Sequence, residues 1–170
     1  MRVLITVASR HGATQEIGEW AATTLRARGH DVDVRDPAEV EDVTGYDAVV
    51  VGSAVYVGHW LAPARDLLAR HADDLRARPV WLFSSGLSTQ PSAASNSPHE
   101  LGRAIELVRA RGHRSFRGRL DREVLSFAER ATIAGARARE GDHRDVDAVR
   151  RWADEVADAL DGVRTSLVAG

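Results

Sequence analysis

Short apolar runs alternate along this chain with longer segments in which apolar residues recur every three or four positions. The runs are β-branched, as in Val3–Val7, or end in small residues, as in Asp47–Ser53, and both features are typical of buried strands. The longer segments predict amphipathic helices, the last of which carries Val149, Trp152 and Val156 on one stripe. The expected strands are residues 3–7, 31–35, 47–53, 79–86 and 113–120, and the expected helices are 14–28, 61–75, one beginning at 97, 120–138 and 146–160.

This alternation of strands and helices predicts βαβ units, and therefore an α/β fold with a parallel sheet. Five strands with helices between them favour a doubly wound sheet of strand order 2-1-3-4-5, with helices on both faces. No linker rich in proline, glycine or serine divides the 170 residues. We therefore expect a single domain over residues 1–170.

The composition is that of an ordinary soluble globular protein, with 28% charged and 44% hydrophobic residues. A net charge of −2 provides no basic footprint, so nucleic acid is not an expected partner. No apolar run approaches the roughly 20 residues of a transmembrane helix, and the first residues begin a strand rather than a signal peptide. The sequence therefore predicts a cytoplasmic protein without an integral membrane segment.

Two residue types are missing, and their absence excludes several kinds of chemistry. Zero cysteines exclude disulfides, thiolate metal sites, iron–sulfur clusters and cysteine nucleophiles. No metal site is predicted, and any redox chemistry must come from a bound cofactor. All 23 basic residues are arginine, so a Walker-type phosphate loop and Schiff-base chemistry are excluded as well, because both need lysine.

Three loops follow the expected central strands, at residues 9–14, 53–60 and 84–89, and all three carry small, hydroxyl and glycine residues. In an open α/β sheet, ligands bind at such carboxyl ends, where the strand order reverses. The loop at 9–14 leads into a helix whose unpaired N–H groups and dipole favour an anion. It contains no carboxylate, and Arg10 and His11 add donors that suit a phosphate. A plain helix cap is the alternative interpretation.

The loop at 53–60 is too apolar for an ordinary solvated turn. Tyr56 and Trp60 offer aromatic faces on which a flat ligand can stack. Gly58 allows the peptide at this point to adopt alternative orientations. The competing interpretation is that Tyr56 and Trp60 simply cover the core.

At these residues the chain resembles a known family. The pattern Ser9-x-His11-Gly12-x-Thr14 is similar to the flavodoxin phosphate signature, with His11 in the place of a hydroxyl residue. The segment from Val51 to Trp60 is similar to the corresponding segment of menaquinone-dependent protoporphyrinogen oxidases. The resemblance implies a flavodoxin-like three-layer sandwich that binds FMN.

The resemblance also implies which residues hold FMN and which could move protons. The phosphate would lie against Ser9, Arg10, His11, Gly12, Ala13 and Thr14, and the isoalloxazine between Ala54, Val55, Tyr56, Val57 and Gly58 on one side and Ser85, Gly86 and Leu87 on the other. His59 is the titratable residue next to the implied ring, where it is either a proton relay or an ordinary surface histidine.

The chain departs from those oxidases after the fifth strand, where they carry a long, basic, aromatic-rich segment. Here residues 121–140 contain interspersed acids and a single aromatic residue, Phe127. A receiver domain is excluded because it needs acidic residues and a lysine at the strand ends. A dinucleotide-binding domain is excluded because no Gly-x-Gly-x-x-Gly follows the first strand.

Three functions therefore stay open. The first is an FMN-dependent oxidoreductase, similar to protoporphyrinogen oxidase and using a quinone or another acceptor. The second is a flavodoxin-type electron carrier that docks on protein partners, although carriers of that type are more acidic than this chain. The third is a flavodoxin-like domain that has lost FMN. The expected partners are a small-molecule or protein electron donor and acceptor, and homo-oligomerisation is left open.

Overall fold

A five-stranded parallel sheet forms the centre of the molecule, with strands in the order β2-β1-β3-β5-β6. The computed structural model describes residues 1–56, 58–86, 98–121, 123, 130 and 140–168. The strands are β1 (Arg2–Ala8), β2 (Asp31–Arg35), β3 (Ala48–Tyr56), β5 (Val80–Gly86) and β6 (Gly112–Arg117). Counting these parallel strands along the chain gives the order 2-1-3-4-5, so the predicted topology is confirmed.

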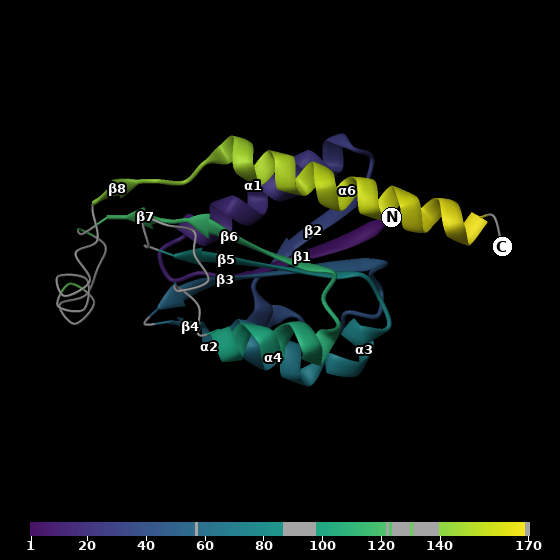
Figure 1. Cartoon of the computed structure of the whole chain (residues 1–170), viewed down its shortest axis with the longest axis horizontal. Coiled ribbons are helices and arrows are strands. Elements are labelled where there is room, and N and C mark those ends of the chain that lie inside the picture. Colours follow the sequence, from purple (N-terminus) through teal and green to yellow (C-terminus); the bar gives the residue numbers. More distant parts are fainter. Residues whose placement is uncertain (57, 87–97, 122, 124–129, 131–139, 169–170) are drawn as a thin grey trace.

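Helices cover both faces of this sheet and complete the three-layer sandwich (Figure 1). One face carries α1 (Ala13–Ala27) and α6 (Val146–Val168), which pack against each other. The other face carries α2 (Ala62–Arg70), α3 (Ala72–Arg76) and α4 (Pro98–Val108), and a short 3-10 helix, η1 (Pro37–Glu39), follows β2. No described helix is long and apolar enough to cross a membrane.

Two expected elements are divided in the structure. The single helix expected over 61–75 is interrupted at His71, although the apolar side chains of both parts, Leu68 and Leu75, enter the same core. The strand expected over 113–120 ends at Arg117, although the Gly118 N–H still donates to the Gly86 carbonyl oxygen at 2.7 Å. The interruptions are tertiary effects that hydrophobic periodicity does not register.

Two short antiparallel pairings lie beyond the parallel sheet. In one, β4 (His59–Trp60) folds back on the end of β3, with Gly58 at a φ of 79° in the turn. In the other, β7 (Arg119–Leu120) pairs with β8 (Gly141–Asp142). The helix expected over 120–138 falls almost entirely outside the described residues, and Leu120 belongs to β7 instead.

The core consists of two apolar clusters, one on each face of the sheet. Between the sheet and α6, Phe83, Phe116 and Trp152 meet edge to face, with ring centroids 5.5 to 6.0 Å apart. The central strands β1, β3 and β5 are therefore buried on both faces, as their apolar sequences predict, and their carboxyl ends lie together at one edge of the sheet.

Candidate functional site

A hollow of about 520 Å3, open to solvent, lies at the carboxyl ends of β1, β3 and β5. It brings together residues from all three loops that the sequence singles out. Nine of the expected site residues line it: Ser9, His11, Ala13, Thr14, Ala54, Val55, Tyr56, Ser85 and Gly86. Expected residues from Ser9 to Gly86 therefore form one concave surface. It lies where ligands of doubly wound sheets bind.

The turn between β1 and α1 presents a helix N-terminus to this hollow. Gly12 is the N-cap residue of α1 and has a φ of 80°, a left-handed conformation that glycine adopts without strain. No side chain in the described part of the chain caps α1, whereas Asp36 caps η1 and Asp145 accepts a hydrogen bond from the Ala148 N–H at the start of α6. Such a helix start suits an anion from outside the chain.

The residues of the turn face in different directions. Ala13 and Thr14 line the hollow, and Thr14 is only 3% exposed. His11 lines it too, at the place where the flavodoxin signature has a hydroxyl. Arg10 is not a lining residue. Its guanidinium carbon lies 4.8 Å from the ring centroid of Tyr56, a cation–π contact that links the turn to the end of β3.

Tyr56 and Trp60 have different surroundings in the structure. Tyr56 is half-buried and lines the hollow together with Ala54 and Val55. Trp60 instead is 5% exposed, packs in the core on the α2 face, and donates from Nε1 to Ser84 Oγ at 2.9 Å. The core interpretation therefore holds for Trp60, and the site interpretation for Tyr56 stays a prediction.

Gly58 and His59 belong to the hairpin beside the hollow and do not line it. His59 Nδ1 lies 2.6 Å from Glu100 Oε2 in α4, and Glu100 Oε1 accepts a hydrogen bond from the Trp60 N–H at 3.0 Å. Glu100 thus ties the β3–β4 hairpin to α4. Two expected residues, Val57 and Leu87, lie outside the described residues.

The fourth wall consists of Gly118, Arg119, Leu120 and Asp121, none of which was an expected site residue. The sequence held a usable signal, because these residues follow an expected parallel strand and carboxyl ends of parallel strands share one edge. Gly118 fits closely there, since a β-carbon would approach the Gly86 carbonyl oxygen to 3.0 Å. The wall supplies Arg119, a cationic lining residue that the three loops alone do not provide.

A half-buried histidine, His113, lies on β6. His113 Nε2 is 2.7 Å from Ser84 Oγ, the hydroxyl that also accepts the hydrogen bond from Trp60. Burial lowers the pKa of His113 to about 4, because an imidazolium loses its hydration there. His113 is therefore neutral near pH 7 and is part of the fold rather than a proton donor to the hollow.

The structure offers FMN a matching set of groups. A phosphate suits the uncapped start of α1, where Gly12 leaves open space around its Cα. A flat ring suits the wall of Ala54, Val55 and Tyr56, and Ser85 and Gly86 line the hollow from the neighbouring strand, where Ser85 pairs with Ala54. Among the described residues no group of three or more histidines and carboxylates is placed to hold a metal ion.

A profile of the Flavodoxin domain family matches residues 4–147 of the chain. Among curated proteins, the chain is similar to protoporphyrinogen IX dehydrogenase [quinone] of Escherichia coli strain K12, with 30% identity over 89 residues. That match covers 51% of this chain and 49% of the relative, so the chain spans about half the length of the curated relatives it matches.

Solved structures of similar fold include a flavodoxin from the domain Archaea, with a TM-score of 0.61, 13% identity, and coverage of 95% of this chain and 99% of that chain. Rubredoxin oxygen:oxidoreductase of Desulfovibrio gigas gives a TM-score of 0.63 at 15% identity, covering 95% of this chain and 36% of that one. A flavodoxin of Streptococcus pneumoniae TIGR4 gives 0.59 at 20% identity, covering 94% and 99%. At these identities the likeness shows the fold.

Proposed function

The chain belongs to the flavodoxin domain family, whose cofactor is FMN, and from that premise we propose that it is an oxidoreductase with FMN in the hollow at the carboxyl ends of β1, β3 and β5. One observation carries the proposal. The three loops that the sequence singles out converge on a single hollow, at the start of a helix that no side chain caps. In this proposal the hollow both binds FMN and is the place of the redox reaction.

Each wall has a separate task in this proposal. The turn from Ser9 to Thr14 binds the phosphate through backbone N–H groups of α1 and through the hydroxyls of Ser9 and Thr14. Ala54–Tyr56 and the adjoining hairpin bind one side of the isoalloxazine, and Ser85–Gly86 the other. His59 lies on this hairpin, where Glu100 holds its ring in place, and is a proton relay only if the ring edge reaches the hairpin.

FMN, when bound, supplies hydride and electron transfer. The protein binds and orients it, and the apolar wall of Ala54 and Val55 excludes water from one side of the hollow.

The more specific candidate is a protoporphyrinogen oxidase-like activity with a quinone acceptor. The 30% identity to the E. coli protoporphyrinogen IX dehydrogenase, over 51% of this chain, favours this activity. The decisive measurement is anaerobic turnover of protoporphyrinogen IX with a quinone. Turnover supports this candidate, whereas FMN binding without turnover favours a flavodoxin-type carrier or another substrate.

FMN binding itself is tested by titrating the purified protein with FMN and following flavin fluorescence. We expect about one FMN per chain. Thr14→Ala should raise the dissociation constant by roughly 10- to 100-fold, since a hydrogen bond to a charged group contributes about 1.5–3 kcal/mol. Thr23→Ala is the matched control, because Thr23 lies on the same helix and its hydroxyl donates to the Glu19 carbonyl oxygen.

A protein that neither retains FMN nor binds it on reconstitution would exclude both redox functions. It would leave the third possibility, a flavodoxin-like domain without its cofactor. Equal FMN affinity in Thr14→Ala and wild-type protein would mean that the phosphate does not bind at the start of α1.

A further inference from the structure

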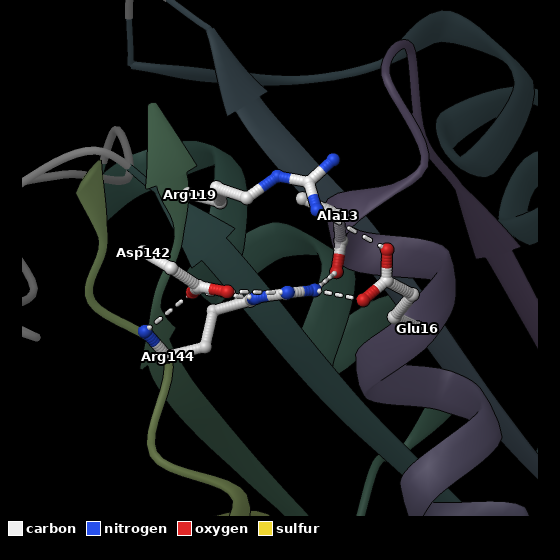
Figure 2. A network of polar contacts seen from close by, with 5 residues as sticks. All are labelled: Ala13, Glu16, Arg119, Asp142 and Arg144. Carbon is white, nitrogen blue, oxygen red and sulfur yellow. Dashed lines mark hydrogen bonds and ion pairs between the residues drawn. The ribbon is translucent and has the colours of Figure 1, made fainter. Parts of the chain in front are cut away.

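Arg144 is a nearly buried cation at the start of the C-terminal helix, with a side chain only 4% exposed. Its Nε and Nη2 donate to the two carboxylate oxygens of Asp142, at 2.8 and 2.6 Å. Its Nη1 donates to Glu16 Oε2 at 2.8 Å and to the Ala13 carbonyl oxygen at 3.0 Å (Figure 2). The guanidinium carbon also lies 4.7 Å from the ring centroid of Trp20.

These contacts reach the first turn of α1 directly. The carbonyl of Ala13 belongs to the peptide unit that also carries the N–H of Thr14, and both residues line the hollow. A peptide unit is planar, so fixing its oxygen fixes the direction of its N–H. Arg144 therefore holds one of the N–H groups that the start of α1 offers to an anion.

Glu16 extends the same network to the opposite wall. Its Oε1 lies 3.5 Å from Arg119 Nη1, and Arg119 is the cationic residue of the fourth wall. Figure 2 shows Arg119 and Arg144 approaching Glu16 from β7 and from the segment after β8. One carboxylate thus joins the phosphate-facing turn to the residues that enclose it from the far half of the chain.

The charges in this cluster balance, with Arg119 and Arg144 against Glu16 and Asp142. A balanced cluster adds little net potential at the hollow, so its contribution is geometric. The hydrogen bonds that Arg144 donates to Asp142 raise the pKa of Arg144 and lower the pKa of Asp142, so both groups stay charged over the whole ordinary pH range. A buried cation that loses its partners is costly, which keeps the side chain in one place.

We propose that Arg144 is a positioning residue for the phosphate subsite, which sets the peptide between Ala13 and Thr14 and, through Glu16, the place of Arg119. The inference rests on the proposed FMN site. It assigns a role in cofactor selection to a residue that lies 131 positions from Ala13 along the chain. Arg144 acts through these groups and does not line the hollow itself.

The test compares FMN with riboflavin, which lacks the phosphate. Arg144→Met should raise the dissociation constant for FMN at least tenfold and leave that for riboflavin within about threefold, since only the phosphate subsite loses its alignment. Arg144→Lys keeps the charge without the two-pronged geometry, and should also weaken FMN selectively. Arg144→Lys is also the variant on which the test depends if Arg144→Met does not fold.

Arg28→Met is the matched control. Arg28 follows the other end of α1 and pairs with Asp154 and Asp158 of α6 at 3.2 and 2.5 Å, so its loss loosens the same helix pair far from the hollow. Both dissociation constants should stay within about threefold of wild type. Hydrogen exchange in ligand-free protein gives an independent readout: Arg144→Lys should speed exchange in the first turn of α1, and Arg28→Met only near its end.

The outcomes separate the two proposals. If wild-type protein binds no FMN, the proposed function and this inference both fail. If wild-type protein binds FMN and both Arg144 variants bind it equally well, the inference alone fails. Equal weakening of FMN and riboflavin in Arg144→Lys would also overturn it, because it would mean a general structural role. Selective loss of FMN with faster exchange at residues 13–16 supports it.

Discussion

At the scale of single residues, the tightest constraint in the described core is the contact between Gly52 and Phe83. The two residues are neighbours across β3 and β5, and a β-carbon on Gly52 would overlap the Phe83 ring. That ring also contacts Phe116 and Trp152 edge to face, so it has little room to move. Gly52 is therefore required by packing, although its φ is not left-handed.

Gly52→Ala should destabilise the protein by about 1–3 kcal/mol, the usual cost of overfilling a packed core. Urea unfolding followed by tryptophan fluorescence measures the change. Gly102→Ala is the control, because a β-carbon on Gly102 meets nothing within 4 Å in α4 and should stabilise that helix by roughly 0.5–1 kcal/mol. Equal stability of Gly52→Ala and wild type would contradict the packing described for Phe83.

At the scale of elements, the starts of α1 and α6 differ in a way that matches their tasks. Asp145 Oδ1 accepts a hydrogen bond from the Ala148 N–H at 2.9 Å, so α6 caps itself. α1 begins at Gly12 without a side-chain cap and points its first turn at the hollow. The start of α6 is thus stabilised by its own side chain, whereas at the start of α1 the proposed phosphate would take that place.

Removing the cap of α6 should cost stability without changing the phosphate site. We expect Asp145→Ala to lower the free energy of unfolding by about 1 kcal/mol, the usual effect of losing an N-cap. Asp147→Ala removes a carboxylate from the same turn, but that group forms a surface pair with Arg150, so the change should stay within about 0.5 kcal/mol. Equal midpoints of thermal unfolding in the two variants would mean that the cap contributes nothing.

At the scale of the whole molecule, a buried histidine, His30, and a half-buried one, His113, make the fold sensitive to acid. Desolvation lowers the pKa of His30, which is 5% exposed and whose ring nitrogens find no hydrogen-bond partner in the described part of the chain. His113 is shifted the same way, to about 4. Both groups bind protons more readily in the unfolded chain, so stability rises as the pH rises from about 4 to about 6.5.

The sign of the effect follows from those shifts. The stability contributed by neutral His113 is present above its unfolded pKa near 6.5 and is lost as the pH falls toward 4. Between pH 7.5 and 4.5 the loss from His113 should be roughly 1–2 kcal/mol, allowing for its partial exposure. Urea midpoints at the two pH values measure it. His113→Asn should show a smaller pH dependence, and His30 should account for part of what remains.

The alternation of buried strands and amphipathic helices determined the fold, because burial on both faces of a parallel sheet leaves a local signature in each strand. The sequence also located three loops of the hollow, since carboxyl ends of parallel strands share one edge. It could not separate Tyr56 from Trp60, because both are aromatic residues of one hairpin, and only packing sends Trp60 to Ser84 in the core.

The sequence by itself thus indicated the sheet order and the turn at residues 9–14, and its family resemblance indicated FMN. The tertiary structure alone decided the rest: the end of β6 at Arg117, the wall that carries Arg119, and the tie between Arg144 and Glu16 across 128 positions. The reason is physical. Periodicity records which residues one element buries, whereas an ion pair or a pocket wall depends on which elements meet in space.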